Sequence, residues 1–371
     1  MKIVCVGGGT MGHVNPAVSI LNYAIKNHNL EGHLITDLKC KSNIKDLNTA
    51  EDNIFILNIS KTPKNIISIP FMIFEYIKCL YASIIYLNKI KPNYIIGFGG
   101  YVSVFPIIAA SLLNIFYSIV NFFTNENTFV CKILIHEQNK IPGKANILLS
   151  YFASCVALSF PDTDEVKKFF CKTHYTGNPI RDNLENFTQN AKQNKNTFNI
   201  LIFAGSQGSK VLNEKIPEII NNINIKFQNF NIKISHQSNE ATKKLLEEKY
   251  KNYNIEAKIS NYFENIEAEY QQADLVICRS GASSIFELIA TAKPAILIPY
   301  PFAYKDHQLL NAKYLIDNEA GFIVLEQNIE SELYQVLLNI FNNIDILDKC
   351  KLNLKKLKNN STKKLMELIL S

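Results

Sequence analysis

A glycine-rich loop followed directly by a histidine lies close to the N-terminus. Four of the fourteen glycines fall within GGGTMG at 7–12, and His13 comes next. Glycine permits tight turns and close approach of the backbone to a ligand, and the N–H groups that open a helix attract anions. The pattern therefore predicts a phosphate-binding loop with His13 as a candidate general base at its lip. A histidine that only hydrogen-bonds within the loop is the alternative.

A second glycine loop, FAGSQGS at 203–209, follows a predicted strand in the other half of the chain. Two such loops, one per domain, suit a protein that binds a phosphate-bearing molecule on each side. The first loop alone also satisfies the dinucleotide pattern GxGxxG, with Asp37 at the end of the next predicted strand to bind a ribose. An NAD-dependent oxidoreductase therefore remains an alternative, although it would need only one such loop.

A third candidate site is the stretch RSGASSIFEL at 279–288, which opens a predicted helix directly after a strand. Its small and hydroxyl side chains are typical of the anion-receiving position of an open α/β sheet. Glu287, one turn into that helix, could bind a diol through both carboxylate oxygens, or could simply complement the helix dipole. Arg181 and Arg279 are the only arginines, and arginine is retained mostly where lysine cannot replace its planar fork. The sequence alone does not assign Arg279 to a ligand.

The elements that must position these residues alternate between strand and helix in both halves. Apolar runs predict strands at 2–8, 33–37, 94–100, 132–138, 155–160, 199–208, 274–281 and 295–300. A polar stretch at 188–196 separates the first five runs from the last three. The alternation predicts an α/β protein with two doubly wound parallel sheets, and 371 residues are more than one core usually serves.

Composition excludes several classes of protein. The eight cysteines are dispersed without a CxxC pair, which indicates free thiols in a reducing compartment and no structural zinc. The first residues enter a predicted strand without the basic region and cleavage site of a secretory signal. The net charge of +6 comes almost wholly from lysine that is not interleaved with aromatic residues. We therefore expect attraction to an anionic membrane surface and no binding to nucleic acid.

Two long apolar stretches bear on membrane contact. No charged residue occurs from Tyr94 to Asn125, which is long enough for a transmembrane helix, but three glycines and Pro106 interrupt the first part. A span, a helix partly inserted in the membrane interface and an ordinary buried helix all stay open. The stretch 66–87 contains Glu75 and Lys78 and predicts an amphipathic helix, as does the basic tail at 349–370.

Seven motifs in chain order carry a resemblance to a known family. They are GGGTMGH (7–13), GFGGYVS (97–103), HEQNKIPGKAN (136–146), TGNPIR (176–181), GSQGS (205–209), ADLVICRSGASSIFEL (273–288) and DHQLLNA (306–312). Across nearly its whole length, the chain resembles the UDP-N-acetylglucosamine transferases of peptidoglycan synthesis in glycosyltransferase family 28. The resemblance implies the GT-B fold, with two Rossmann-like doubly wound parallel-sheet domains facing a cleft.

The resemblance also implies which residues form each domain and what each domain binds. Residues 1–181 would form an acceptor- and membrane-binding domain, and residues 182–345 a domain for the UDP-sugar donor. A C-terminal helix at about 346–371 would pack back on the first domain. The segment at 114–130 is longer than usual for the family, which predicts deeper membrane contact.

The activity that the resemblance implies is an inverting glycosyl transfer. N-acetylglucosamine would pass from UDP-N-acetylglucosamine to the 4-hydroxyl of undecaprenyl-pyrophosphoryl-MurNAc-pentapeptide (lipid I), forming lipid II. The enzyme would be peripheral, at the cytoplasmic face of the inner membrane, and would use no metal and no cofactor. A GT-B enzyme that glycosylates another lipid stays open, as does a degenerate homologue that only binds nucleotide or membrane.

Individual residues match positions with known roles in the family. His13 matches the base that takes the proton of the acceptor hydroxyl, Glu287 a carboxylate on the ribose, and Phe263 the residue whose backbone reads the uracil. The full set of expected donor contacts is Thr10, Met11, Gly12, Asn139, Arg181, Ser206, Phe263, Gly281, Ala282, Ser283, Ser284, Ile285, Phe286, Glu287, Gln308 and Asn311. Met11 replaces a glycine usual in the family, and if that position needs a positive φ, strain of roughly 1 kcal/mol or more would result.

Overall fold

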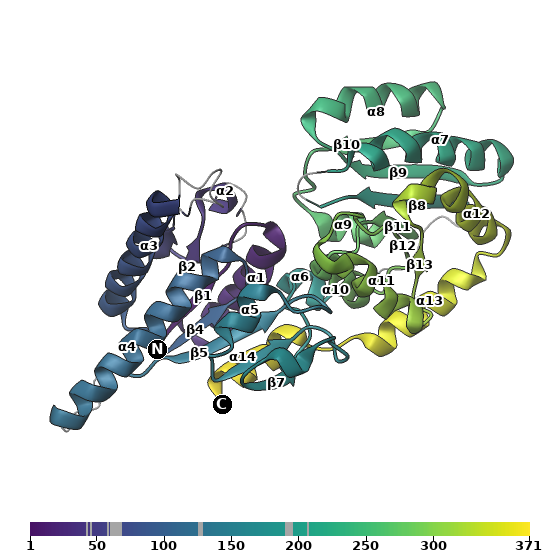
Figure 1. Ribbon diagram of the computed structural model, residues 1–371. Coiled ribbons are helices and arrows are strands. Elements are labelled where there is room, and N and C mark those ends of the chain that lie inside the picture. Colours follow the sequence, from purple (N-terminus) through teal and green to yellow (C-terminus); the bar gives the residue numbers. More distant parts are fainter. Residues whose placement is uncertain are drawn as a thin grey trace. The chain divides into compact units, whose positions relative to one another are not determined.

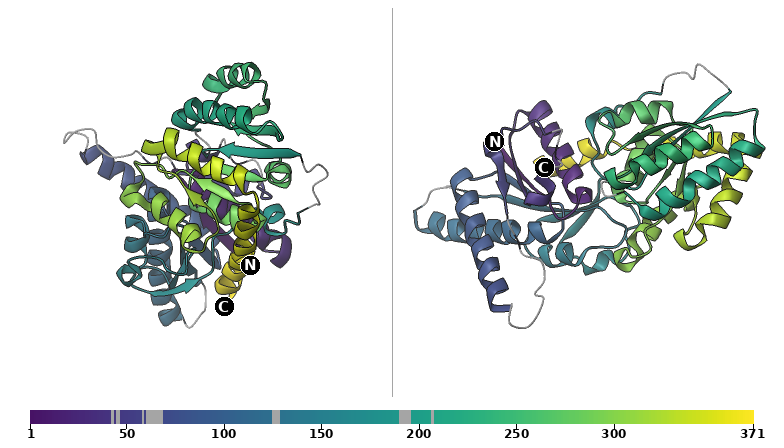
Figure 2. Two further views of the ribbon diagram at one scale, coloured as in Figure 1. Left: turned by 90° about the vertical axis from the view of Figure 1, so that its right-hand side faces the viewer. Right: turned by 90° about the horizontal axis from the view of Figure 1, so that it is seen from above.

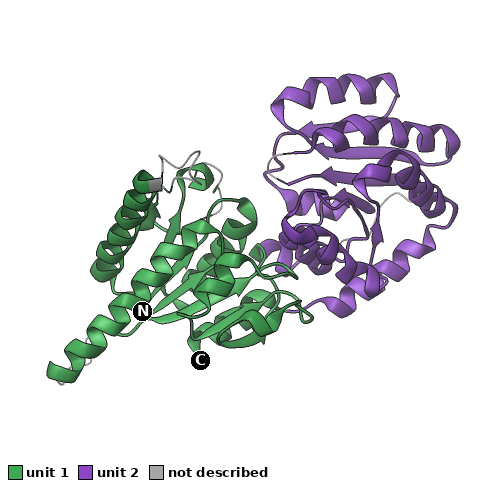
Figure 3. Cartoon of the chain, in the orientation of Figure 1, with its two compact units in different colours: residues 1–182, 360–371 green, residues 183–359 purple. Residues whose placement is uncertain are grey.

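The computed structural model describes residues 1–41, 44, 47–57, 59, 69–124, 129–189, 196–205 and 208–371 (Figure 1). The chain forms two compact units (Figure 3). Unit 1 comprises Met1–Asp182 together with Asn360–Ser371, and unit 2 comprises Asn183–Asn359. Each unit is built on one parallel sheet, which confirms the predicted α/β architecture.

The sheet of unit 1 has the strand order β3-β2-β1-β4-β5-β6-β7. Its strands are β1 (Lys2–Val6), β2 (Glu31–Thr36), β3 (Ile54–Ile56), β4 (Tyr94–Gly97), β5 (Lys132–Glu137), β6 (Cys155–Leu158) and β7 (Lys172–Tyr175). The central strands are buried on both faces, which explains their nearly continuous apolar sequences. The order reverses between β1 and β4, and ligands of such sheets bind at the carboxyl ends of the strands at this reversal.

Helices cover both faces of the sheet in unit 1 (Figures 1 and 2). They are α1 (Met11–His28), α2 (Leu38–Lys41), α3 (Ile69–Ile90), α4 (Val104–Thr124), α5 (Lys144–Leu149), α6 (Asp182–Glu185), of which only Asp182 belongs to unit 1, and α14 (Ser361–Leu370). One face packs on α3, α4 and α5 through a cluster that includes Leu87 and Ile107. The other packs on α1 and α14 through a cluster that includes Leu21 and Leu365.

The sheet of unit 2 has the strand order β10-β9-β8-β11-β12-β13 and reverses between β8 and β11. Its strands are β8 (Thr197–Phe203), β9 (Asn231–Gln237), β10 (Glu256–Ser260), β11 (Leu275–Cys278), β12 (Ala295–Leu297) and β13 (Phe322–Ile323). Its longer helices are α7 (Lys210–Lys226), α8 (Glu240–Asn252), α9 (Ile266–Gln272), α10 (Ala282–Thr291), α11 (His307–Asp317), α12 (Ile329–Asn342) and α13 (Asp345–Leu357).

The predicted single C-terminal helix at 346–371 is wrong. The segment forms two helices, α13 and α14, separated by residues 358–360. α13 contacts α10 in unit 2, and its Leu347 joins the core of that unit, whereas α14 contacts α1 in unit 1. Two separate apolar faces, each buried in a different core, require the chain to leave one unit and enter the other at this break.

Candidate functional site

The two loops at the reversal point of unit 1 pack directly on each other. A Cβ added to Gly8 would lie 2.5 Å from Cγ2 of Val102, and one added to Gly100 would lie 2.9 Å from the carbonyl oxygen of Gly8. Gly9 has φ of +81°, and its added Cβ would lie 3.0 Å from the ring of Tyr101. The predicted glycine requirement therefore arises from contact between the loops after β1 and β4, as well as from backbone conformation.

His13 lies in the first turn of α1, half-buried beside these loops. Its Nδ1 is 3.1 Å from the carbonyl oxygen of Gly8 and 3.4 Å from Oγ1 of Thr10. Because a carbonyl oxygen can only accept, Nδ1 of the neutral ring carries the proton and Nε2 keeps its lone pair. The loop hydrogen bond and the role of a base are therefore compatible, because they use different ring nitrogens.

Asp37, the residue on which the NAD alternative depended, is buried and bonded within the chain. Its Oδ2 accepts hydrogen bonds from N–H of Gly9 at 2.8 Å and from the hydroxyl of Tyr101 at 2.7 Å, and its Oδ1 accepts one from N–H of Cys40 at 2.9 Å. Burial acts to raise the pKa of Asp37, but these hydrogen bonds outweigh it and lower the pKa. The carboxylate therefore braces the first loop and is not presented to a ribose.

The backbone conformation of Met11, close to His13, differs from the expectation. Met11 is the first residue of α1 and is not among the residues with positive φ, so the predicted strain does not arise. Its side chain packs against the apolar cluster beneath α1. Thr10 is the N-cap residue, yet its side chain makes no capping hydrogen bond, and Gly12 is exposed. The Thr10 side chain therefore caps none of the N–H groups in the opening turn of α1.

Two further predicted residues of unit 1 lie after other strands. Asn139 follows β5 in a loop shaped by the buried Glu137, whose carboxylate accepts hydrogen bonds from N–H of Asn139 at 3.0 Å and of Gly143 at 2.9 Å. Arg181 is half-buried and directly precedes α6. Ser206 lies outside the described residues.

The amino end of α10 in unit 2 is open. Its N-cap residue is Gly281, with φ of −63°, and an added Cβ there would meet no atom within 4 Å. The Oγ of Ser283 is buried and has no hydrogen-bond partner. The first turn of α10 thus combines backbone N–H groups without a side-chain cap, the positive end of the helix dipole and an unpartnered hydroxyl, which is the chemistry of an anion site.

Glu287 and Phe263, two further predicted donor contacts in unit 2, differ in burial. Glu287 is half-buried on α10, and its Oε2 accepts a hydrogen bond of 3.0 Å from the hydroxyl of the buried Tyr270 on α9. Phe263 follows β10 and is buried. Tyr270 was missed by the sequence analysis because only the packing of α9 against the sheet brings its hydroxyl to Glu287.

The remaining predicted residues of α10 and α11 differ in what they can offer a ligand. Ala282, Ile285 and Phe286 are buried, so only their backbones are suited to contact, while Ser284 is half-buried. Gln308 accepts a hydrogen bond from N–H of Tyr300 at 3.0 Å through Oε1.

Asn311 braces this region from the interior. Its side chain is fully buried and donates to the carbonyl of Ser280 at 3.3 Å, while the hydroxyl of Ser280 donates to the carbonyl of Gln308 at 2.8 Å. These bonds tie α11 to the end of β11.

Arg279 is buried and joins several segments of unit 2 through its hydrogen bonds. Its guanidinium donates to the carbonyls of Ile298 at 3.1 Å and Pro299 at 3.2 Å and to Oγ of Ser209 at 2.9 Å, and it forms an ion pair with Glu326. Ser209 is also the N-cap residue of α7. A lysine ammonium could not satisfy four partners in this planar arrangement, which explains why an arginine is retained here.

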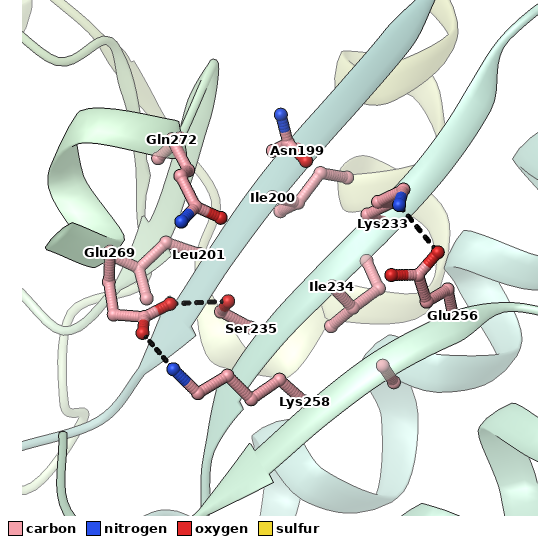
Figure 4. Close-up of a pocket in the computed structure, with 12 residues that line it drawn as sticks. Asn199, Ile200, Leu201, Lys233, Ile234, Ser235, Glu256, Lys258, Glu269 and Gln272 are labelled. Atoms are coloured by element: carbon pink, nitrogen blue, oxygen red, sulfur yellow. Dashed lines mark hydrogen bonds and ion pairs between the residues drawn. The ribbon is translucent and has the colours of Figure 1, made fainter.

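A polar pocket of about 200 Å³ lies on one face of the second sheet, between β8, β9, β10 and α9 (Figure 4). The buried Glu269 accepts hydrogen bonds from Ser235 at 2.6 Å and from Lys258 at 2.5 Å, and Lys233 pairs with Glu256 at 2.6 Å. The strand residues that line it lie within the first five positions of their strands, away from the carboxyl edge. Within the described ranges, no group of three or more His, Cys, Asp or Glu side chains is arranged to hold a metal.

Comparison with known proteins identifies the family of the chain. Residues 3–158 match the glycosyltransferase family 28 N-terminal domain, and residues 199–369 match the C-terminal domain of the same family. The chain is 35% identical to the UDP-N-acetylglucosamine–N-acetylmuramyl-(pentapeptide) pyrophosphoryl-undecaprenol N-acetylglucosamine transferase of Rickettsia bellii, over 99% of this chain and 98% of that protein. The enzyme of the same name from Rickettsia felis is 34% identical, over 96% of this chain and 95% of that protein.

The fold agrees as well. The crystal structure of Acinetobacter baumannii MurG superposes with a TM-score of 0.74 at 25% sequence identity, covering 100% of this chain and 99% of that one. The two domain matches, the relatives and the fold therefore all indicate the same family. This chain is a member of glycosyltransferase family 28.

Proposed function

We propose that this chain transfers N-acetylglucosamine from UDP-N-acetylglucosamine to the 4-hydroxyl of the muramyl sugar of lipid I, forming lipid II for peptidoglycan. The names of its relatives support these substrates. Within this chain, the proposal is carried by the open amino end of α10. The backbone of Gly281 suits any residue and no neighbour crowds it, so the fold itself does not require glycine there. A bound ligand supplies the missing reason.

The donor would bind with its diphosphate at the amino end of α10. The N–H groups of the first turn and the unpartnered hydroxyl of Ser283 would stabilise the negative charge that develops on the leaving diphosphate. Glu287, held by Tyr270, would accept hydrogen bonds from the ribose hydroxyls. Gln308 keeps its amide N–H groups for the sugar, since its Oε1 is engaged by the backbone of Tyr300.

His13 would supply the base. Nε2 takes the proton of the acceptor hydroxyl while the hydroxyl oxygen bonds to C1 of N-acetylglucosamine, and UDP leaves from the opposite side of C1 with the bonding electron pair. The anomeric centre is therefore inverted. Nδ1 stays bonded to the carbonyl of Gly8 throughout, which keeps the ring in place as it becomes cationic.

We also propose that unit 1 binds the membrane that holds the lipid acceptor. Exposed apolar side chains form stripes on two adjacent helices, namely Ile73, Ile77, Tyr81 and Ile85 on α3 and Leu112, Ile115, Phe116, Ile119, Phe122 and Phe123 on α4. The last turns of α4 project from the sheet (Figure 1), where Phe122 is 81% and Phe123 80% exposed. The exposed Lys78, Lys89 and Lys91 favour an anionic leaflet, which for this reaction is the cytoplasmic face of the inner membrane.

The length of these helices does not by itself decide between spanning and lying on the membrane. Within the described ranges, residues 70–90 and 101–124 are each long and apolar enough to cross a bilayer by length and composition. However, Pro106, Ile107, Ala109, Ala110 and Leu113 of α4 are buried in the core of unit 1. A spanning α4 would have to withdraw them from that core, so we favour a peripheral arrangement in which the end of α4 enters the interface.

Purified protein given radiolabelled UDP-N-acetylglucosamine and a lipid-linked muramyl acceptor should form a disaccharide lipid. The variant Gly281→Val should remain folded, because no atom lies within 4 Å of the new Cβ, and should lose donor binding and transfer. Transfer to diacylglycerol but not to the muramyl lipid would establish the other GT-B acceptor class. Nucleotide binding without any transfer would establish a degenerate homologue.

Sedimentation with vesicles tests the membrane proposal separately. The variant Phe122→Ser/Phe123→Ser should bind anionic vesicles more weakly than the unchanged chain. Phe302→Ser is the matched control, because Phe302 is 81% exposed but belongs to unit 2. Equal binding by all three proteins would refute a role for the end of α4.

A further inference from the structure

The peptide group that joins Gly8 to Gly9 is hydrogen-bonded at both ends. Its carbonyl oxygen, from Gly8, is 3.1 Å from Nδ1 of His13. Its N–H, from Gly9, donates to Oδ2 of Asp37 at 2.8 Å. Two hydrogen bonds thus link the Asp37 carboxylate, through this one peptide group, to Nδ1 of His13, the ring nitrogen that does not act as the base.

We infer that Asp37 is a positioning residue for His13 and acts through the Gly8–Gly9 peptide. The inference rests on the proposed function, in which Nε2 of His13 takes the acceptor proton. A carboxylate that accepts the N–H of a peptide increases the negative character of its carbonyl oxygen, since linked hydrogen bonds polarise one another. That carbonyl then holds the Nδ1–H tautomer more firmly and stabilises the imidazolium that forms during transfer. The arrangement resembles a direct carboxylate–histidine pair with one peptide inserted.

The groups around Asp37 keep it as the charged member of this cluster. Burial raises the pKa of the Tyr101 phenol, and the hydrogen bond to Asp37 raises it further. Burial, together with the interaction with Asp37, raises the pKa of the Cys40 thiol to about 12. Phenol and thiol are therefore neutral at physiological pH, while the lowered pKa of Asp37 keeps its carboxylate ionised.

The surrounding packing prevents the linking peptide from turning. Val102 leaves no room beside Gly8, and the ring of Tyr101 lies against Gly9 while its hydroxyl bonds to the same Asp37 oxygen. A peptide that packs against Val102 and Tyr101 and is hydrogen-bonded at both ends presents its carbonyl in one direction. This rigidity is what a positioning role requires, because a general base must be held in reach of the proton it removes.

The first test uses the unaltered protein and needs no activity. Nitrogen-15 NMR of the imidazole should show that neutral His13 carries its proton on Nδ1 and none on Nε2. A proton on Nε2 instead would overturn the inference, whatever reaction the protein catalyses. If this tautomer is found but no sugar transfer occurs, the proposed function fails while the hydrogen-bonded chain stands.

The second test separates positioning from general support of the fold. Asp37→Asn should lower kcat by roughly tenfold, as loss of an outer hydrogen-bonding partner typically does, with the KM for UDP-N-acetylglucosamine little changed. The same change should shift the His13 Nδ1 resonance toward that of a weaker hydrogen bond. Glu31→Gln, at the start of β2, the strand that Asp37 directly follows, is the matched control and should leave both readouts unchanged.

Combining Asp37→Asn with His13→Ala decides whether the two residues act together. If Asp37 acts through His13, the double variant should be no slower than His13→Ala alone. A further tenfold loss in the double variant, or an unmoved His13 resonance in Asp37→Asn, would overturn the inference. Should Asp37→Asn fail to fold, the NMR measurement on the unaltered protein still decides the tautomer on which the inference depends.

Discussion

In both units, glycines stand at the point where the strand order reverses, but their neighbours differ. In unit 1, Cβ atoms added to Gly7, Gly8 and Gly100 would lie 2.6, 2.5 and 2.9 Å from other atoms of the chain. In unit 2, Cβ atoms added to Gly205 and Gly281 would meet nothing within 4 Å. The first set of glycines is explained by the protein itself, and Gly281 is not.

This difference corresponds to two kinds of chemistry on one fold. A base must be held in a single orientation, so the loops of unit 1 are packed against each other and tied to Asp37. A site for a diphosphate, as we propose for unit 2, must leave backbone N–H groups uncovered until the ligand arrives, and the amino end of α10 is open in this way. The crowded Gly7, Gly8 and Gly100 therefore mark a rigid part of unit 1, and the uncrowded Gly281 marks the place that we propose for a ligand in unit 2.

The largest effect expected from this comparison is at His13. The variant His13→Ala should lower kcat by about 10²- to 10⁴-fold, the range typical of a lost general base, while UDP binding measured by calorimetry stays unchanged. A comparable loss of UDP binding would break the assignment of proton transfer to unit 1 and donor binding to unit 2.

The second effect is at Glu287. We expect Glu287→Gln to weaken UDP binding by about 10- to 100-fold, because a charge-assisted hydrogen bond to the ribose is lost. The control is Glu330→Gln, which changes an acid in the first turn of α12 in the same unit. If both variants bind UDP as the unaltered chain does, the carboxylate of Glu287 serves only the helix and Tyr270.

The third effect is on stability and uses the same substitution in both units. Gly8→Ser should reduce the free energy of unfolding by about 2 kcal/mol, as overpacking does, because Val102 already fills the space. Gly281→Ser should change it by less than about 0.5 kcal/mol, since the new side chain enters open space. Urea unfolding measures both, and equal losses would remove the distinction between crowded and open loops.

The smallest effect concerns one buried histidine in each unit. Burial lowers the pKa of His136 in unit 1 to about 4, against a hydrogen bond to Gly177 that raises it, and burial lowers the pKa of His236 in unit 2 to about 3. Since the unfolded chain binds a proton near pH 6.5 and the folded chain does not, stability is full above that pH and falls as the pH drops toward these values.

Between pH 7.5 and 5.5, each histidine should therefore cost about 1 kcal/mol of unfolding free energy. Urea unfolding at the two pH values measures the total pH dependence, to which His33 and His307 also contribute because burial lowers the pKa of each. His136→Gln or His236→Gln should each remove its own share. Stability that is unchanged between these pH values would show that neither ring stays neutral in the folded protein.

Several features of the fold and the site follow from local sequence. The alternation of apolar strands and amphipathic helices predicts both sheets, and the glycine runs at 7–12 and around 281 mark both reversal points. These signals are readable because strand periodicity, glycine turns and helix starts depend on neighbouring residues. The resemblance to family 28 added the roles proposed for His13 and Glu287, which local physics alone left open.

Other features were decided by contacts between distant parts of the chain. The sequence predicts Asp37 as a possible ribose ligand, but its partners Gly9 and Tyr101 lie 28 and 64 residues away in sequence. Arg279 had no assignable role until Ser209, 70 residues away, was seen to accept from it. The break between α13 and α14 likewise depends on which core buries each apolar face.

The sequence by itself thus determined the two α/β folds, their family and the loops that carry the chemistry, because each is recorded in short runs of residue types. Tertiary structure alone decided which loops are crowded and which are open, and that the carboxylate of Asp37 is bonded to the first loop while that of Glu287 is bonded to Tyr270. Hydrogen bonds and excluded volume act between atoms a few ångströms apart, whatever their separation along the chain, and no local pattern specifies those distances.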